Sequence, residues 1–182
     1  MKLIFIYKNI IYILSNMIIR NTTLVDIDEI CELQSSCFES GDTWSRYTYL
    51  KYINNSLVIE IDNKIVSVLI QGHITPSGYG KIFEPVNEIG QKFLDDKKNK
   101  QSTFGIALIF TDNNFRKKGF GEILINKHFE LNKNRTVCLN TRVSNTNSIS
   151  LYKKVGYNHI ANIKNYYNYP SEDSVFMIKE TI

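Results

Sequence analysis

The sequence has few cysteines, and their arrangement excludes two classes of protein. Cys31, Cys37 and Cys138 make an odd number and form no CxxC pair. They therefore supply neither the framework of a small disulfide-stabilised protein nor a zinc-binding pattern. Each is best explained as a small buried hydrophobic residue, and we expect an intracellular, cytoplasmic protein.

Histidines and clustered basic residues are equally sparse. The three histidines are scattered, with no HxxxH pattern and no paired carboxylates, so we expect no metal. The net charge is +4, and lysine and arginine form no stripe with interleaved aromatic residues, so we expect no nucleic-acid partner. This modest positive charge still favours an anionic ligand.

Long apolar runs are also missing. The most suggestive one, Ile10 to Leu14, follows Lys2 and Lys8, but it is short, comes directly after Asn9 and lacks a small-residue cleavage site. It fits neither a signal peptide nor a membrane-spanning helix. We interpret residues 1–16 as an N-terminal extension and expect no membrane association.

Residues 17–182 are predicted to form a single domain. The periodicity of apolar residues predicts strands at 17–21, 56–61, 65–70, 103–111, 137–143, 157–163 and 174–178, and helices at 22–38, 44–53, 119–131 and 145–152. This order predicts a mixed α/β sheet of about seven strands with four main helices. Residues 73–102, which lack periodicity, are interpreted as an insertion with one helix near 86–94.

The first chemical pattern is Arg116-Lys117-Lys118-Gly119-Phe120-Gly121, between a buried strand and a helix. Its two glycines allow close backbone approach to a ligand, and the helix start offers unpaired amides and a positive dipole end. The three cations add to this, so the segment suits a pyrophosphate. Its spacing matches neither the P-loop nor GxGxxG. A surface turn that opens a helix is the alternative.

This segment resembles the R/Q-x-x-G-x-G/A signature of the GCN5-related N-acetyltransferase (GNAT) superfamily. Residues 142–152 resemble its R-x-x-N-x-x-A-I-x-L-Y pattern and residues 153–157 its K-x-x-G-F, with Ser148 for the usual Ala and Tyr157 for the usual Phe. The resemblance implies the GNAT fold with a central splay between two strands. It also implies transfer of acetyl from acetyl-CoA (coenzyme A) to a primary amine by direct attack.

The resemblance also assigns residues to acetyl-CoA. The backbone of Leu108, Ile109 and Phe110 would bind pantetheine, and the pyrophosphate would lie on the segment Arg116, Lys117, Lys118, Gly119, Phe120 and Gly121. Asn145 would bind near the pantetheine arm, with a helix N-cap as its alternative role. Tyr152 would protonate the leaving thiolate or hydrogen-bond to it, with a half-buried core tyrosine as the alternative.

Asn165-Tyr166-Tyr167 resembles the N-Y-Y turn of protein N-terminal acetyltransferases, both the ribosomal-protein-alanine type and the NatA-catalytic-subunit type. The resemblance implies that Tyr166 and Tyr167, together with Phe38, bind a protein or peptide N-terminus. A surface aromatic loop is the alternative. A lysine side chain or a small polyamine is the alternative acceptor, and a non-catalytic acyl-CoA-binding module is the alternative to an enzyme.

The general base is the point at which the pattern breaks. Related N-terminal acetyltransferases often have Glu or His on the strand before the second signature, and the matching residue here is Asn140. We therefore expect Glu39 or Asp42 to act as the base, directly or through water, although solvated loop acids are the simpler interpretation. The sequence does not predict the preferred acceptor sequence, an auxiliary subunit or the oligomeric state.

Overall fold

The computed structural model describes residues 3–7, 10–14, 16–38, 43–74, 83–95 and 103–180 of the chain. By its contacts the chain divides into two compact units. The first comprises residues 1–71 and 108–128, and the second comprises residues 72–107 and 129–182. Strand β7 (Thr103–Thr111) and helix α4 (Phe120–Leu131) each contribute residues to both units.

The first unit contains strands in the order β3 (Met17–Asn21), β4 (Ser56–Ile61), β5 (Lys64–Ile74) and the last residues of β7. Strand β4 pairs antiparallel with both β3 and β5. The β4–β5 turn consists of Asp62 and Asn63, which have φ angles of 50° and 64°. Short polar side chains tolerate this left-handed conformation, which a two-residue hairpin requires.

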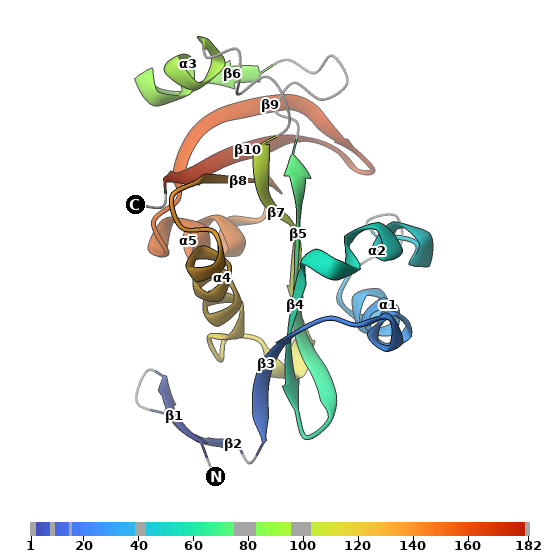
Figure 1. Ribbon diagram of the computed structural model, residues 1–182. Coiled ribbons are helices and arrows are strands. Elements are labelled where there is room, and N and C mark those ends of the chain that lie inside the picture. The colour runs from blue at the N-terminus through green and yellow to red at the C-terminus, as the bar shows by residue number, and fades with distance from the viewer. Residues whose placement is uncertain are drawn as a thin grey trace. The chain divides into compact units, whose positions relative to one another are not determined.

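Helices α1 (Ile27–Cys37) and α2 (Arg46–Tyr52) lie side by side along one face of β4 and β5 (Figure 1). The core between them consists of aliphatic and aromatic side chains: Ile27, Ile30, Leu33, Tyr49, Ile53, Val58, Ile65, Val68, Ile70 and Phe110. Because buried apolar surface contributes about 25 cal/mol per Å², burial of these side chains stabilises the packing of the helices on the strands.

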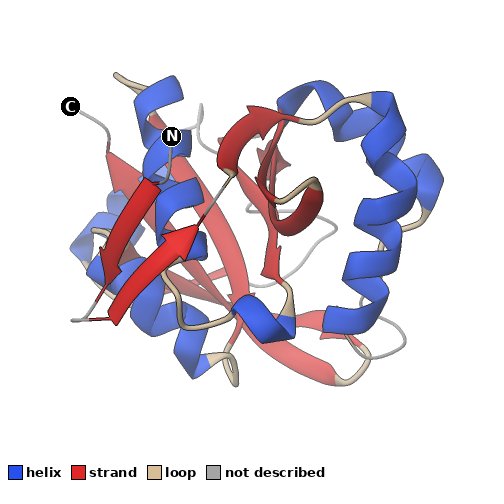
Figure 2. Ribbon diagram, turned by 90° about the horizontal axis from the view of Figure 1, so that it is seen from below, coloured by secondary structure: helices blue, strands red, loops and turns tan. Residues whose placement is uncertain are grey.

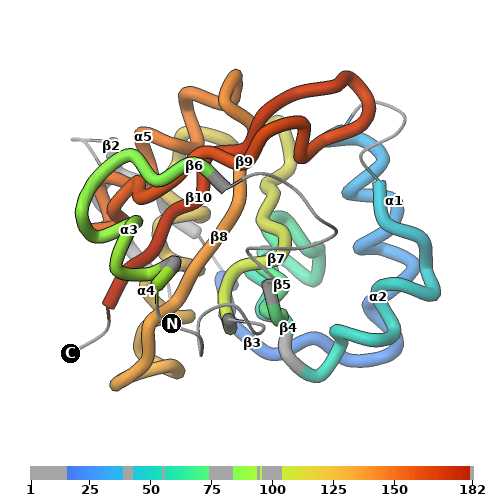
Figure 3. Tube along the Cα trace, turned by 90° about the horizontal axis from the view of Figure 1, so that it is seen from above, coloured from blue at the N-terminus to red at the C-terminus, as the bar shows by residue number. Residues whose placement is uncertain are grey.

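The second unit contains strands in the order β7 (its first residues), β8 (Thr136–Arg142), β10 (Ser171–Glu180), β9 (Asn158–Asn168) and β6 (Phe83–Pro85). Strands β7 and β8 are parallel, with Gly105 opposite Cys138 and Ile106 opposite Leu139. Strands β9 and β10 are antiparallel and run together to their connecting turn (Figure 3). The unit also contains α3 (Glu88–Asp95) and α5 (Thr146–Lys154).

The N-terminal extension contains a hairpin that the sequence analysis did not predict. Strand β1 (Leu3–Tyr7) pairs antiparallel with β2 (Ile10–Leu14), and the two lie next to the N-terminus in Figure 2. Among the described residues, no helix combines the length and the apolar character needed to cross a bilayer.

The predicted mixed α/β architecture is confirmed. In the described part of the chain, eight strands belong to the mixed sheet, against about seven expected. The extra strand is the short β6, which lies within the predicted insertion and pairs with β9. The described residues contain five α-helices, namely the four main ones and α3, the helix expected in the insertion.

Candidate active site

The predicted pyrophosphate segment lies in a tight loop between β7 and α4. Lys117 and Gly119 have φ angles of 61° and 88°, so the chain turns sharply just before the helix begins at Phe120. The Ile123 amide donates to the Gly119 carbonyl at 3.0 Å, which closes the first helical turn. The amides ahead of it have no intrahelical acceptor, and this geometry is suited to an anion.

Arg116 fastens this loop to the rest of its unit. Its Nε donates to the carbonyl of Thr111 at 3.2 Å, and its Nη2 donates to the carbonyl of Cys37 at 3.4 Å. Two of its donors are therefore engaged by the ends of β7 and α1. The ammonium of Lys118 lies 4.7 Å from the centroid of the Phe115 ring. Arg116 thus shapes the loop in addition to adding positive charge.

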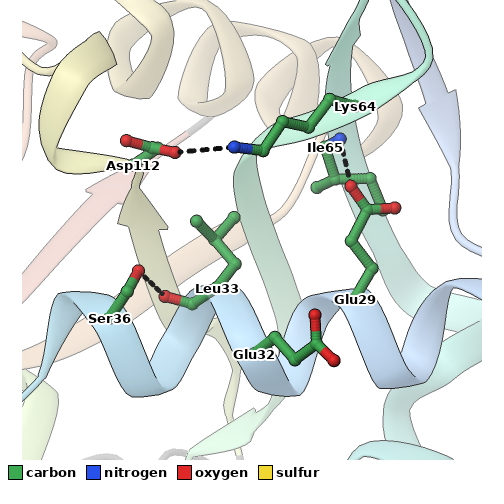
Figure 4. A pocket seen from close by; sticks show the side chains of 7 residues that line it. All are labelled: Glu29, Glu32, Leu33, Ser36, Lys64, Ile65 and Asp112. Atoms are coloured by element: carbon green, nitrogen blue, oxygen red, sulfur yellow. Dashed lines mark hydrogen bonds and ion pairs between the residues drawn. The ribbon is translucent and has the colours of Figure 1, made fainter.

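A pocket of about 190 Å³ lies between α1, the start of β5 and Asp112, which follows β7 (Figure 4). Asp112 Oδ1 accepts from the Asn114 amide at 2.8 Å, and its Oδ2 lies 3.6 Å from Lys64 Nζ. Glu29 Oε1 accepts from the Ile65 amide at 2.7 Å. The lining residues are Glu29, Glu32, Leu33, Ser36, Lys64, Ile65 and Asp112. None of these is a predicted site residue, and the ion pair between Lys64 and Asp112 connects the start of β5 to the residue that follows β7.

The last residues of β7 were predicted to bind pantetheine through their backbone. Leu108 and Ile109 are half-buried, whereas Phe110 is buried and its carbonyl accepts from Ser67 Oγ at 3.2 Å. The Phe38 ring packs edge-on against Phe110 with centroids 5.7 Å apart. The structure therefore brings Phe38, predicted for the acceptor, into contact with Phe110, predicted for the cofactor.

Asn145 is the N-cap of α5. Its side-chain oxygen accepts from the Ser148 amide at 3.3 Å, and its own amide donates to the Arg142 carbonyl at 3.0 Å. The alternative role named for Asn145 is thus observed. The side chain is also exposed, so a ligand role stays a prediction.

Tyr152 is buried and fixed at the C-terminal end of α5. The Tyr157 amide donates to the Tyr152 carbonyl at 2.9 Å, and the Gly156 amide donates to the Lys153 carbonyl at 3.1 Å. Gly156 has a φ of 94°, so these bonds form a Schellman cap. The rings of Tyr152 and Tyr157 pack edge-to-face at 5.7 Å. Burial raises the pKa of the Tyr152 phenol, so the hydroxyl stays protonated at neutral pH.

Tyr166 and Tyr167 do not form the turn that was expected. Strand β9 continues through both residues to Asn168, and Tyr167 pairs with Glu172 of β10. Tyrosine is favoured in strands, so the predicted strand end at residue 163 is too early. Both rings are half-buried and pack edge-to-face with centroids 5.0 Å apart.

Asn140, at the position of the usual base, is a half-buried amide on β8. Its Oδ1 accepts from Ser174 Oγ at 3.2 Å, and its Nδ2 has no acceptor among the described residues. A neutral amide cannot accept a proton at neutral pH. Glu39 and Asp42 lie outside the described residues, so their proposed role as base stays a prediction.

The ion pair between Arg142 and Glu172 was not predicted from the sequence. Arg142 opens the second signature, but its partner lies thirty residues later on another strand. Only the strand register brings the two together, because β10 pairs with both β8 and β9. The signature arginine was the one available signal.

Comparison with solved structures identifies the class of fold. The ribosomal-protein-S18-alanine N-acetyltransferase from Escherichia coli has a TM-score of 0.68 and 16% identity, with 92% of this chain and 96% of that chain covered. NAA60 from Arabidopsis thaliana in complex with acetyl-CoA has a TM-score of 0.69 and 14% identity, with coverages of 91% and 99%. The fold is that of these acetyltransferases.

Sequence comparison agrees. A putative ribosomal protein bS18-alanine N-acetyltransferase from Bacillus subtilis is 31% identical, with 87% of this chain and 92% of the relative covered. An N-alpha-acetyltransferase from Sulfurisphaera tokodaii is 25% identical, with coverages of 87% and 90%. An uncharacterised protein from Mycobacterium leprae is 22% identical over 90% of this chain, which spans 41% of that longer protein.

The model of the acetyltransferase (GNAT) family matches residues 27–157. The chain therefore belongs to the acetyltransferase (GNAT) family, and the predicted N-acetyltransferase class and fold are confirmed.

Proposed function

We propose that this protein is an acetyl-CoA-dependent N-acetyltransferase whose acceptor is the α-amine of a protein or peptide. The observation that carries the proposal is the tyrosine pair Tyr166–Tyr167, which is fixed near the β9–β10 turn. Phenol hydroxyls suit the backbone donors and acceptors of an extended peptide. The names of the Bacillus subtilis and Sulfurisphaera tokodaii relatives describe the same kind of acceptor.

The loop before α4 fits the pyrophosphate of acetyl-CoA. Gly119 has a positive φ that glycine adopts readily, and because it lacks a Cβ the backbone can come close to a ligand. The helix start presents amides to that ligand. Lys117 adds positive charge beside them. In this proposal the backbone of Leu108, Ile109 and Phe110 and the side chain of Asn145 hold the pantetheine arm. When bound, acetyl-CoA supplies the activated acetyl group.

The identity of Asn140 favours an α-amine over a lysine. At pH 7.5, about a third of α-amines with an ordinary pKa near 7.8 are neutral, against about 0.1% of lysine side chains with a pKa near 10.4. Because the Asn140 amide cannot remove a proton, an acceptor that is already partly neutral is the better substrate. After the neutral amine attacks the thioester, its nitrogen must lose one more proton, and a weak base or a water molecule suffices to accept it.

Tyr152 has the properties of a donor to the departing thiolate. Its hydroxyl is kept protonated by burial, and its ring is fixed by the α5 cap and by Tyr157. Because burial raises the pKa of the phenol, complete proton transfer is less favourable than for a free tyrosine. We therefore assign Tyr152 the role of stabilising the thiolate mainly by a hydrogen bond.

The proposal is tested by following coenzyme A thiol release with matched peptides. One peptide has a free α-amine and no lysine, and its partner has a blocked N-terminus and one internal lysine. We expect release with the first, at several times the hydrolysis background. Mass spectrometry should locate the acetyl group on the first residue. Acetylation of the internal lysine alone would refute the proposed acceptor.

A non-catalytic acyl-CoA-binding module is the second candidate, and Asn140 at the usual base position is the observation that favours it. The same assay separates the two. Tight acetyl-CoA binding by calorimetry, without thiol release for α-amine, lysine or polyamine acceptors, would identify the module and exclude the enzyme.

A further inference from the structure

The side chain of Arg142 makes an unusually complete set of contacts with the β9–β10 turn. Its Nη1 donates to the Pro170 carbonyl at 3.0 Å and to Glu172 Oε2 at 3.2 Å. Its Nη2 donates to the Tyr169 carbonyl at 2.8 Å. The guanidinium carbon lies 4.1 Å from the centroid of the Tyr167 ring. The Arg142 side chain therefore hydrogen-bonds to the backbone of the turn and also stacks on the Tyr167 ring.

Glu172 connects this arrangement to the start of α5. While its Oε2 receives the Arg142 donor, its Oε1 accepts from the Ser144 amide at 2.6 Å. Ser144 directly precedes Asn145, the N-cap residue of α5. The side chains of Arg142 and Glu172 are 15% and 19% exposed, so solvent screens their attraction less than at the surface.

A second acid secures the other side of the same hairpin. Strand β10 has a register shift between Glu172 and Ser174, which lets the intervening Asp173 reach β9. Asp173 Oδ1 accepts from the Asn165 amide at 2.9 Å, and its Oδ2 pairs with Lys164 Nζ at 2.9 Å. Glu172 therefore contacts Arg142 of β8, whereas the next residue, Asp173, contacts β9. Of these two acids, only Glu172 binds the guanidinium that stacks on Tyr167.

We propose that Arg142 and Glu172 are positioning residues for the acceptor, which hold the Tyr167 ring in the orientation that binds the substrate peptide. This inference rests on the proposed function, because Tyr167 is the acceptor-binding residue there. The guanidinium lies over one face of the ring, and the ring of Tyr166 packs edge-to-face with it. A side chain fixed in advance loses less conformational entropy when a ligand binds, so the pair acts on acceptor affinity.

Only arginine supplies this combination of contacts. Its planar fork binds two carbonyls and a carboxylate at once and lies flat on the ring, whereas the lysine ammonium is a single compact charge. Arg142→Lys therefore keeps the charge and removes the geometry. Glu172→Gln keeps an acceptor for Ser144 and removes the ionic part of the pair.

The test is steady-state kinetics with acetyl-CoA and a peptide with a free α-amine. For Arg142→Lys we expect the KM for the peptide to rise about 3- to 10-fold, as the loss of one preorganised side chain implies. The KM for acetyl-CoA should change less than about twofold on the same scale. Glu172→Gln should show a smaller change in the same direction. Amide hydrogen exchange should also become faster in residues 165–172.

Lys164→Met is the matched control. It removes the ion pairs of Lys164 with Asp173 on the same hairpin and with Glu84 on β6, but it does not alter the contact between Arg142 and the Tyr167 ring. We expect it to leave both KM values unchanged. Equal rises in both KM values for Arg142→Lys, a fall in kcat alone, or the same effect from Lys164→Met would overturn the positioning role. A wild-type protein that acetylates no peptide α-amine would instead refute the proposed function.

Discussion

The hydroxyl of Tyr152 and that of its neighbour Tyr157 lie in one buried cluster but have different expected roles. Tyr152 is 5% exposed and Tyr157 is 2% exposed, and burial raises the pKa of both phenols. The Tyr157 hydroxyl has no partner among the described residues. A buried hydroxyl without a hydrogen-bond partner lowers the stability of the folded protein, so the Tyr157 hydroxyl does not stabilise the fold.

Tyr152→Phe should lower kcat about 100-fold, the lower end of the range for a proton donor, because burial weakens this phenol as an acid. The ring packing against Tyr157 survives in the variant, so the dissociation constant of acetyl-CoA should hardly change. Thiol-release kinetics and calorimetry measure the two quantities. Equal losses in turnover and affinity would argue against a donor role.

Tyr157→Phe is the matched control for that experiment. It removes the unpaired hydroxyl of the adjacent ring and restores the residue that the family pattern usually has. We expect unchanged kcat and a free energy of unfolding that is equal or higher, because an unsatisfied polar group is lost.

At the scale of the element, the start of α1 depends on one buried carboxylate. Asp26 accepts from the Thr23 amide at 2.6 Å and receives two donors of Arg20 at 2.8 Å each. The guanidinium of Arg20 lowers the pKa of Asp26 to about 2. Arg20 also pairs with Glu60 of β4 at 2.7 Å. This network ties strands β3 and β4 to the helix start.

Asp26→Asn should lower the free energy of unfolding by about 2 kcal/mol, as urea denaturation can measure. Removing one partner of a buried pair typically costs about 3 to 5 kcal/mol, and the loss is smaller here because Arg20 keeps Glu60 and stays partly exposed.

Asp28→Asn, on the same helix, is the control for this loss. It breaks the ion pair between Asp28 and Arg46. The side chain of Arg46 is 56% exposed and that of Asp28 is 75% exposed. This exposed pair should contribute less than about 0.5 kcal/mol. Similar losses in both variants would contradict the role assigned to Asp26.

The sequence predicted those elements whose signals are local. Residues 17–21, 56–61 and 103–111 coincide with β3, β4 and β7, because each is an apolar run bounded by polar or turn residues. The short β6 and the end of β9 were not predicted. The existence of β6 depends on pairing with β9, which lies far later in the sequence. The end of β9 pairs with the start of β10 across a short turn, and it was not predicted because Asn165 and Asn168 are residue types that favour turns.

For the whole molecule, His128 links stability to pH. It lies on α4 with 0% exposure, and burial lowers its pKa to about 4 from the ordinary value of 6.5. As the pH falls below 6.5, the unfolded chain binds a proton that the folded protein does not. The stabilisation is therefore fully present above pH 6.5 and is lost progressively down to about pH 4.

His128→Leu should make the free energy of unfolding less dependent on pH in this window. The wild-type protein should lose up to about 3 kcal/mol between pH 6.5 and pH 4 through this group, since one pKa unit corresponds to about 1.4 kcal/mol. Urea denaturation at several pH values measures both curves. Parallel curves for the two proteins would show that His128 is not the responsible group.

Residues of the candidate site that belong to a sequence motif could be located from the sequence. Contacts that depend on how the strands pair could not. Gly119, Asn145 and Tyr152 belong to patterns with fixed spacing, so their positions near helix termini follow from the sequence. The Arg142–Glu172 pair and the amide Nδ2 of Asn140 depend on contacts between strands that are far apart in the sequence. No local pattern specifies such contacts.

The register shift at Asp173 also restricts how this hairpin can change in length. Side chains in a strand alternate between faces, so a single residue inserted or deleted between 165 and 167 would reverse the face on which Tyr167 lies. A change of two residues would restore the face but would move the Tyr167 ring about 7 Å along the strand, away from the guanidinium of Arg142. New acceptor preferences are therefore expected to arise by substitution within this hairpin and not by a change in its length.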